Sequence, residues 1–196
     1  PTQSGNSVLG VDLVILLHGV GGNFYGGGLF EDMSDSIVDA GCAVLRVNNR
    51  GHDPISRGPG DGQRFGAAYE IVDDCRYDWD AWITFAHHTG YRNIVLWGHS
   101  LGAVKSIYYM ATENDPRIKM MIASSPPQFS YTGYQIMGDW DNYKQQLDEA
   151  NQHVSDGHPE ALMEVLYPSA NLLTAEVFLD KYGPEEKYDV VKLLPN

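Results

Sequence analysis

The sequence predicts an α/β fold with a mostly parallel β-sheet flanked by helices. Two observations carry this prediction. Short runs of buried-type residues alternate with amphipathic stretches over residues 11–127, which is the pattern of repeated strand–helix units. Glycines stand where several of these stretches end, as they do after helices and in turns. The length of 196 residues suits one domain, or most of one, with a substantial core.

Four strands and three helices are expected in the first two thirds of the chain. The strands are expected at residues 12–18, 42–48, 93–97 and 119–124, and the helices between them at residues 29–40, 67–88 and 103–112. Residues 49–66 are rich in glycine and contain two prolines, so we expect a long loop without a packed element there. Asp73-Asp74 is expected to cap or interrupt the helix at residues 67–88.

The pattern of apolar residues changes after residue 127. No convincing strand is recognised there, and the apolar spacing indicates helices at residues 143–154, 159–166, 174–182 and 188–194. Twelve acidic residues against four lysines lie between residues 131 and 196, so this part holds most of the chain's excess negative charge. We expect a helical cap over residues 128–187, inserted after the fourth strand and lying over the carboxyl edge of the sheet.

Charge and hydropathy exclude several classes of partner. The net charge of −13 argues against nucleic acid or an anionic membrane surface, because phosphates would be repelled. No apolar run approaches the ~18 residues of a membrane span. Cys42 and Cys75 form no motif, and we expect free thiols and a cytoplasmic location. A trimmed signal peptide stays open as an alternative, since the sequence begins with proline.

The strongest chemical signal is Gly98-His99-Ser100-Leu101-Gly102, between an expected strand and an expected helix. A serine on such a turn is held in a strained backbone conformation with its hydroxyl lifted over the sheet edge. Gly98 and Gly102, with His99, are expected to have structural roles at this turn. The helix that follows directs N–H groups and its positive dipole end to the same place, which suits a developing oxyanion. The alternative is a serine that only caps the helix.

A second signal is His18-Gly19-Val20-Gly21-Gly22 at the end of the first expected strand. Its glycines let the loop expose a backbone N–H beside the serine. We expect Val20, or else Gly21, to form an oxyanion hole together with Leu101. A phosphate-binding loop is the alternative, but neither of the usual glycine spacings is present. His18 ends a buried strand, so we expect it to be a structural hydrogen-bonding group rather than a general base.

The order and spacing of these motifs resemble the α/β-hydrolase superfamily, in particular its serine esterase and lipase-like branch. The resemblance covers about residues 11–127 well, and Asn48-Asn49-Arg50-Gly51-His52 after the second strand belongs to the same pattern. It implies that residues 1–127 are the N-terminal part of the core, that 128–187 are a lid, and that 188–196 lead into further core strands. It also implies hydrolysis through an acyl-enzyme, with Ser100 as the nucleophile.

The resemblance further implies a catalytic acid and a histidine beyond the strands seen here. After Ser100 the chain offers only His153 and His158, both in polar helical segments. We therefore expect 1–196 to be a piece of a longer hydrolase that lacks the C-terminal part, with the missing part or a second polypeptide completing the sheet. His99, His153 and His52 stay open as weaker candidates for the base. The His and Asp spacings suit no metal, and neither a metal nor another cofactor is expected.

An aromatic cluster after the fourth strand suggests the substrate pocket. We expect that pocket to include His18 and four aromatic side chains, or these aromatics to pack the cap onto the core: Phe129, Tyr131, Tyr134 and Trp140. The acidic cap disfavours strongly anionic substrates. The expected activity is hydrolysis of a small-molecule carboxylic ester with a neutral, medium-chain or aromatic acyl group. A non-catalytic binding or assembly module and an amide or carbon–carbon bond hydrolase stay open as alternatives.

Overall fold

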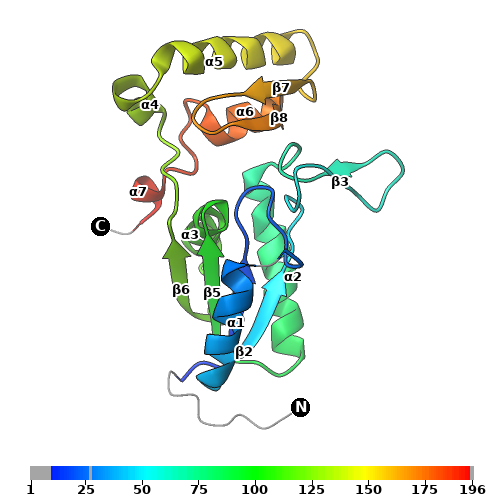
Figure 1. Cartoon of the computed structure of the whole chain (residues 1–196), viewed down its shortest axis with the longest axis vertical. Coiled ribbons are helices and arrows are strands. Elements are labelled where there is room, and N and C mark those ends of the chain that lie inside the picture. Colours follow the sequence, from blue (N-terminus) through cyan, green and yellow to red (C-terminus); the bar gives the residue numbers. More distant parts are fainter. Residues whose placement is uncertain (1–9, 27, 195–196) are drawn as a thin grey trace.

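The computed structural model describes residues 10–26 and 28–194 and shows a four-stranded parallel sheet with helices on both faces (Figure 1). The strand order is β2-β1-β5-β6, and every pairing in this sheet is parallel. The strands are β1 (Leu13–Leu17), β2 (Ala43–Val47), β5 (Ile94–His99) and β6 (Ile118–Ser124). This is the α/β architecture that the sequence predicts.

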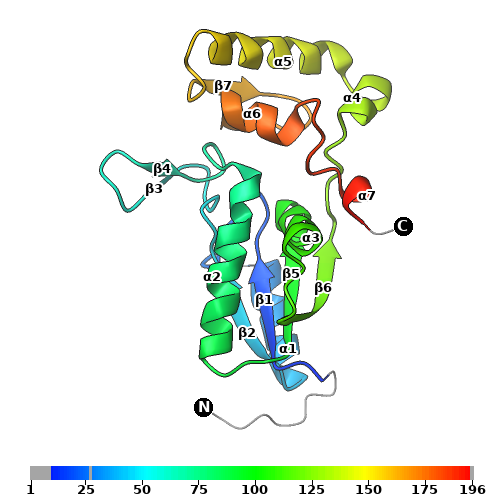
Figure 2. The same cartoon turned by 180° about the vertical axis from the view of Figure 1, so that it is seen from behind.

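Helices cover the two faces of the sheet because successive strand residues point to opposite sides. The helix α1 (Leu29–Asp39) lies on one face, while α2 (Cys75–His88) and α3 (Leu101–Glu113) lie on the other (Figures 1 and 2). Leu13, Ile15 and Leu17 of β1 join the core cluster with α2, and the intervening Val14 and Leu16 join the opposite cluster. Both cysteines are free and buried.

Residues 128–187 form a separate layer, here called the C-terminal layer, above the carboxyl ends of the strands (Figure 2). Its elements are α4 (Tyr131–Met137), α5 (Trp140–Ser155), β7 (Leu162–Val165), β8 (Asn171–Thr174) and α6 (Ala175–Tyr182). The short helix α7 (Val190–Leu193) then returns to contact α3. One core cluster joins Leu101 and Val104 of α3 to Phe129, Tyr143 and Phe178, so the C-terminal layer is packed firmly on the core.

The hairpin β7–β8 corrects the expectation that this layer contains no strand and has a helix at residues 159–166. Leu162–Val165 pairs antiparallel with Asn171–Thr174. Within β7, Met163 and Val165 are buried while Leu162 and Glu164 are exposed, which is the alternation of a strand. The alternation of buried and exposed residues covers only four positions, which is too short to be recognised against the helical spacing of residues 159–166. The pairing with β8 is what makes this segment a strand.

The glycine-rich loop is also more ordered than expected, because its ends pair as β3 (Ser56–Arg57) and β4 (Arg64–Phe65). The glycines between these strands form the turn of a hairpin. The helix expected from residue 67 begins later, with a 3₁₀ turn η1 (Val72–Asp74) before α2. Asp73 and Asp74 form no side-chain cap bond there, and their carboxylates instead bind Arg76 and Arg50 at 2.7 and 2.6 Å.

Candidate active site

Ser100 stands between the end of β5 and the start of α3, with φ 54° and ψ −122°. A positive φ in a residue other than glycine costs about 1–3 kcal/mol, so the surrounding structure must impose it. The neighbouring glycines show how: a Cβ on Gly98 would lie 2.1 Å from the Gly102 carbonyl oxygen, and one on Gly102 would lie 2.5 Å from the carbonyl oxygens of Leu17 and His18. Strand and helix are therefore too close at this turn for any larger residue.

The turn at residues 19–22 lies directly beside Ser100. A Cβ on Gly19 would be 2.9 Å from the Ser100 Cβ and 3.4 Å from its Oγ. The Gly22 N–H donates to the Gly19 carbonyl at 3.2 Å, and Gly21 has φ 61°, so the chain reverses tightly here. The absence of a side chain at Gly19 is what allows this loop to approach the serine.

Two backbone N–H groups near Ser100 are available as donors. Among the described residues, neither the Val20 N–H nor the Leu101 N–H has a hydrogen-bond acceptor within the protein. Leu101 is the first residue of the 13-residue helix α3, where N–H groups lack an intrahelical acceptor and the dipole is positive. The sequence predicts both groups as oxyanion donors, and the structure brings their residues together with Ser100 in one cavity.

Ser100 lies at the junction of two cavities. The first, of 160 Å³, lies beneath the C-terminal layer. It is lined by core residues beside the serine and by residues of the C-terminal layer: Val20, Leu101, Pro127, Gln128, Phe129, Tyr134, Pro168, Ser169, Lys181 and Tyr182. The second, of 380 Å³, lies between the turn at residues 19–22 and α1, and includes Leu29, Phe30 and His99. A group attached to Ser100 therefore has space on two sides.

The predicted pocket residues divide into two sets. Phe129 and Tyr134 line the 160 Å³ cavity with Ser100, and His18 lines the 380 Å³ cavity. Tyr131 and Trp140 line neither, because they pack against Tyr143, with ring centroids 5.9 and 5.5 Å from it. The alternative interpretation, that these aromatics hold the C-terminal layer on the core, therefore describes Tyr131 and Trp140.

His18 is buried, with 3% of its surface exposed. Its Nδ1–H donates to the Gly19 carbonyl oxygen at 2.8 Å, so the proton sits on Nδ1, and the buried Nε2 has no partner among the described residues. Burial lowers the pKa of His18 to about 4, and the nearby charge of Lys105 acts in the same direction. Such a weak base suits the structural role that the sequence predicts, since an efficient general base has a pKa near the working pH.

The low pKa of His18 predicts a loss of stability in mild acid. Between pH 6.5 and pH 4 the unfolded chain binds a proton on this histidine that the folded protein excludes, so stability falls as the pH falls through this window. We expect about 2 kcal/mol to be lost through His18 between pH 7 and pH 5. Urea unfolding at both pH values should show a smaller acid loss in His18→Gln, whereas the exposed His158→Gln should keep the wild-type loss.

Four other histidines make their contacts with groups other than Ser100. The His99 ring contacts Phe30 of α1, with ring centroids 6.2 Å apart. His52 pairs with Asp53 through Nδ1 at 2.8 Å. His153 and His158 lie at the outer, carboxyl end of α5 and just beyond it, 3.8 and 3.9 Å from Glu149 and Glu160. Within residues 10–26 and 28–194, no histidine is bonded to the serine.

A buried ionic group beside the site is absent from the sequence-based predictions. Lys105 of α3 and Glu70 are 1% and 0% exposed in their side chains and form an ion pair. Burial opposes ionisation of Glu70, but the charge of Lys105 outweighs it and holds the pKa of the carboxyl below its usual range. The charge of Lys181 in α6 also acts on this carboxyl and lowers its pKa further. The one available signal is Lys105 itself, a charged residue on the apolar face of an otherwise buried helix.

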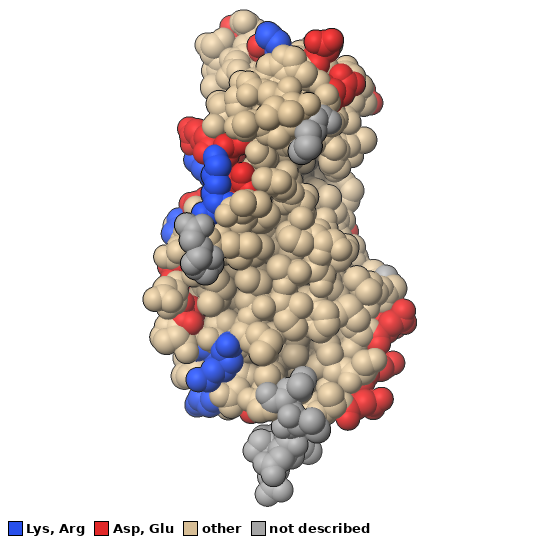
Figure 3. Space-filling model, turned by 90° about the vertical axis from the view of Figure 1, so that its left-hand side faces the viewer, with Lys and Arg blue, Asp and Glu red and all other residues tan. Residues whose placement is uncertain are grey.

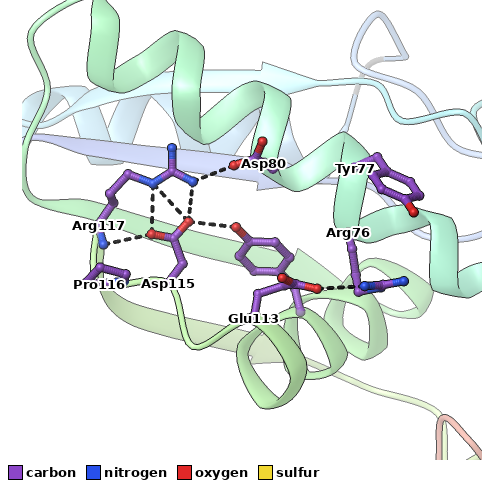
Figure 4. Close-up of a pocket in the computed structure, with 8 residues that line it drawn as sticks. Arg76, Tyr77, Asp80, Glu113, Asp115, Pro116 and Arg117 are labelled. Atoms are coloured by element: carbon purple, nitrogen blue, oxygen red, sulfur yellow. Dashed lines mark hydrogen bonds and ion pairs between the residues drawn. The ribbon is translucent and has the colours of Figure 1, made fainter.

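A 490 Å³ hollow between α2 and α3 is lined by charged residues but lies away from Ser100 (Figure 4). Arg117 there bonds to Asp80 at 2.6 Å and to Asp115 at 2.5 Å, and Arg76 bonds to Glu113 at 2.9 Å. Burial opposes the ionisation of Asp115, but the bonds from Arg117 lower its pKa to about 2. Because these charges satisfy one another, the hollow is a structural ion-pair network.

The described part of the chain contains no group of three or more His, Cys, Asp or Glu side chains that could hold a metal ion. None of its helices is long and apolar enough to cross a membrane.

Comparison with known proteins gives a family and a set of similar folds. The model of the alpha/beta hydrolase fold family matches residues 12–188. No curated protein sequence matches the chain. Among solved structures, the α/β hydrolase GrgF from Penicillium sp. sh18 is similar with a TM-score of 0.64 at 14% identity, covering 92% of this chain and 66% of GrgF.

Two other solved structures show the same fold. A monoacylglycerol lipase from Paleococcus ferrophilus has a TM-score of 0.56 at 18% identity, covering 92% of this chain and 67% of the lipase. Est1E from Butyrivibrio proteoclasticus, with ferulic acid bound, has a TM-score of 0.54 at 17% identity, covering 87% of this chain and 60% of Est1E. The chain thus spans about two thirds or less of the length of these proteins. The family match over residues 12–188, together with the parallel sheet and the strained serine, places this chain in the α/β-hydrolase fold family.

Proposed function

We propose that this protein is a serine hydrolase that cleaves a carboxylic ester through an acyl-enzyme on Ser100. One observation carries the proposal: Ser100 is held at φ 54° beside two unused backbone N–H groups, and it opens onto two cavities. A strained, half-buried serine that opens onto cavities beside such donors is the arrangement that acyl transfer needs. A serine used only as a helix cap would not require a positive φ, and Ser100 makes no side-chain cap bond.

The proposed reaction proceeds in two stages. The Ser100 Oγ attacks the ester carbonyl as a base removes its proton, and the carbonyl oxygen becomes an oxyanion that accepts hydrogen bonds from Val20 and Leu101. The intermediate collapses to an acyl-serine, and the alcohol leaves with a proton. Water then attacks the acyl-serine by the reverse sequence and releases the carboxylic acid.

The cavities suggest which part of the ester lies where. The 160 Å³ cavity has Phe129, Tyr134 and Tyr182 in its wall, and an apolar cavity of about 150 Å³ in another protein accommodates benzene. A medium-chain or single-ring acyl group therefore fits, with the alcohol on the side of the 380 Å³ cavity. The acidic C-terminal layer favours a neutral substrate, since it repels anions approaching the site. The names of the similar lipase and of Est1E with ferulic acid are compatible with an ester substrate.

We propose that the general base and its acid come from polypeptide outside residues 1–196. The five histidines described above contact groups other than Ser100, and the similar structures are longer than this chain. The molecule also has a face with few charges over its middle (Figure 3). A 540 Å³ apolar hollow between α1 and the sheet, lined in part by Met33, Ile37, Trp97 and Ile122, supports a role for further polypeptide in completing the sheet beside β6.

A cytoplasmic location is part of the proposal. Cys42 and Cys75 are free and buried, as expected of a protein from a reducing compartment. Recovery of both thiols unmodified from the native protein, after labelling under denaturing conditions, is the check.

Labelling with a fluorophosphonate tests the activity. In the complete protein we expect one covalent adduct, located on Ser100 by peptide mapping, together with hydrolysis of 4-nitrophenyl esters. Serine reagents attack only an activated hydroxyl, so Ser106, whose hydroxyl donates to the Gly102 carbonyl, serves as the internal control and should stay unmodified.

A second candidate is a non-catalytic binding or assembly module with this fold. It is favoured by the absence of a histidine bonded to Ser100 within the described residues. If the folded complete protein is not labelled and hydrolyses no ester, the module is correct and the esterase is rejected. An amide or a carbon–carbon bond hydrolase would label in the same way, and a higher kcat/KM for amides or β-diketones than for esters would identify it.

A further inference from the structure

Lys181 is a buried lysine in the wall of the cavity that contains Ser100. It belongs to α6 in the C-terminal layer, and only 3% of its surface is exposed. It is one of the residues that line the 160 Å³ cavity, together with Gln128, Tyr134 and Tyr182. Lysines are rarely buried without a partner of opposite charge, so the surroundings of this ammonium group need an explanation.

The ammonium group of Lys181 is incompletely bonded. A lysine carries three N–H donors, and the hydrogen bond found for Lys181 within the described residues goes to the Ala67 carbonyl oxygen at 3.2 Å. No carboxylate of those residues lies within 4 Å of its nitrogen. Burial lowers the pKa of Lys181 to about 8, so the charged form still predominates at pH 7. Lys181, a residue of the cavity wall, therefore keeps N–H donors for which the described residues offer no acceptor.

Two carboxylates, those of Glu70 and Asp180, act electrostatically on Lys181, but both already have other bonding partners. Glu70 pairs with Lys105, and Asp180 accepts bonds at 2.8 Å from the Val72 N–H and from the Tyr188 hydroxyl. Both carboxylates act on Lys181 from outside hydrogen-bond range. They stabilise the ammonium charge, and they also repel a further anion brought into the same buried region.

These surroundings define the chemistry of a matching ligand. A buried N–H without an acceptor carries a desolvation cost, which a ligand oxygen removes when it binds. A neutral oxygen does this without the repulsion that a carboxylate would meet from Glu70 and Asp180. We propose that Lys181 selects acyl groups that carry a neutral oxygen acceptor, a keto, ether or hydroxyl oxygen, at the end remote from the ester. This inference rests on the proposed function and names the substrate class of its pocket.

Matched substrates test the selection in the complete protein. The 4-nitrophenyl esters of 4-oxopentanoic and 4-methylpentanoic acids are similar in size, with a keto oxygen in the first where the second has a methyl group, and 5-oxohexanoic and 5-methylhexanoic acids give a second pair one carbon longer. After subtraction of the uncatalysed rate, we expect kcat/KM to favour the keto ester of at least one pair by about 10-fold or more, the size of effect typical of a hydrogen bond to a charged group.

Two lysine variants assign the preference to one side chain. Lys181→Met keeps the length of the chain but removes its donors, so the ratio should fall to about 1 through loss of the keto ester rate. Lys187→Met removes an exposed lysine of the same layer, which pairs with Glu185 at 3.0 Å, and should keep the wild-type ratio. The ratio is measured within one protein, so a general loss of activity does not change it.

Three results would overturn the inference: no keto preference in either wild-type pair, an unchanged ratio in Lys181→Met, or a faster reaction of the hemisuccinate ester than of the keto esters. A Lys181→Met protein that does not fold leaves the wild-type ratios and the hemisuccinate comparison as the deciding measurements.

Binding separates this inference from the proposed hydrolysis. Calorimetry with Ser100→Ala should show tighter binding of methyl 4-oxopentanoate or methyl 5-oxohexanoate than of its methyl-branched counterpart, whether or not the protein is an esterase. If Ser100 is not labelled but the keto preference in binding is present, the esterase proposal fails and the role of Lys181 stands. Labelling without a keto preference gives the opposite conclusion.

Discussion

Replacing Ser100 by alanine in the complete protein is expected to lower kcat for ester hydrolysis by about 10⁴-fold or more. The substitution removes the Oγ that would carry the acyl group but leaves the donors at Val20 and Leu101 and the shape of both cavities. Initial rates with 4-nitrophenyl esters give the size of the loss, and fluorophosphonate labelling should disappear with it. Alanine also suits the φ of 54° no worse than serine, so the melting temperature should change little.

A distant serine gives the matched control. Ser155 ends α5 with its hydroxyl bonded to the Gln152 carbonyl, far from the site, and Ser155→Ala should keep wild-type rates. If Ser100→Ala retained labelling, or lost less than about 10-fold in kcat, the nucleophile would have to be another residue and the mechanism proposed above would be wrong.

Removing Lys105 should have the largest effect on stability. In Lys105→Met the Glu70 carboxylate loses its ion-pair partner while its side chain is 0% exposed. Breaking a buried ion pair from one side typically costs about 3–5 kcal/mol, because a charge is left uncompensated. Urea unfolding at pH 7 should show a loss of this order, and the folded protein should label at Ser100 more slowly because α3, which carries Lys105, begins directly after Ser100.

The double variant Glu70→Gln/Lys105→Met distinguishes the loss of the ion pair from the cost of leaving the Glu70 charge buried without a partner. It removes the buried charge as well, so we expect it to be more stable than Lys105→Met alone. Lys144→Met is the surface control, since Lys144 pairs with Asp148 at 2.5 Å where both side chains are more than half exposed. Such pairs contribute less than about 1 kcal/mol. Equal effects of Lys105→Met and Lys144→Met would contradict the buried-pair explanation.

The sequence is informative where a local conformation requires a particular residue. Gly98 and Gly102 surround Ser100 because only glycine fits where the start of α3 almost touches β5 and the end of β1, so the turn is visible as a short motif. The same holds for Gly19 against Ser100. The parallel α/β fold follows from buried runs that alternate with helical stretches, and both this fold class and the family are confirmed.

Local pattern was insufficient where pairing decides the structure. The segment 159–166 has helical spacing, yet Leu162–Val165 becomes a strand because β8 lies beside it and buries Met163 and Val165. The β3–β4 hairpin within residues 49–66 was also not predicted, because its two short strands are defined only by their pairing with each other. Among the aromatics, sequence alone did not distinguish Phe129 and Tyr134, which reach the cavity, from Tyr131 and Trp140, which pack on Tyr143.

The sequence by itself determined the parallel α/β fold class, the family and the serine at the turn between β5 and α3, because each depends on residues close together in the chain. Only the tertiary structure revealed the buried group of Glu70, Lys105 and Lys181, which come from three separate segments. It also decided which side chains line the cavity beneath the C-terminal layer. Burial and charge pairing are properties of what surrounds a residue, and for these positions the surroundings come from distant parts of the chain.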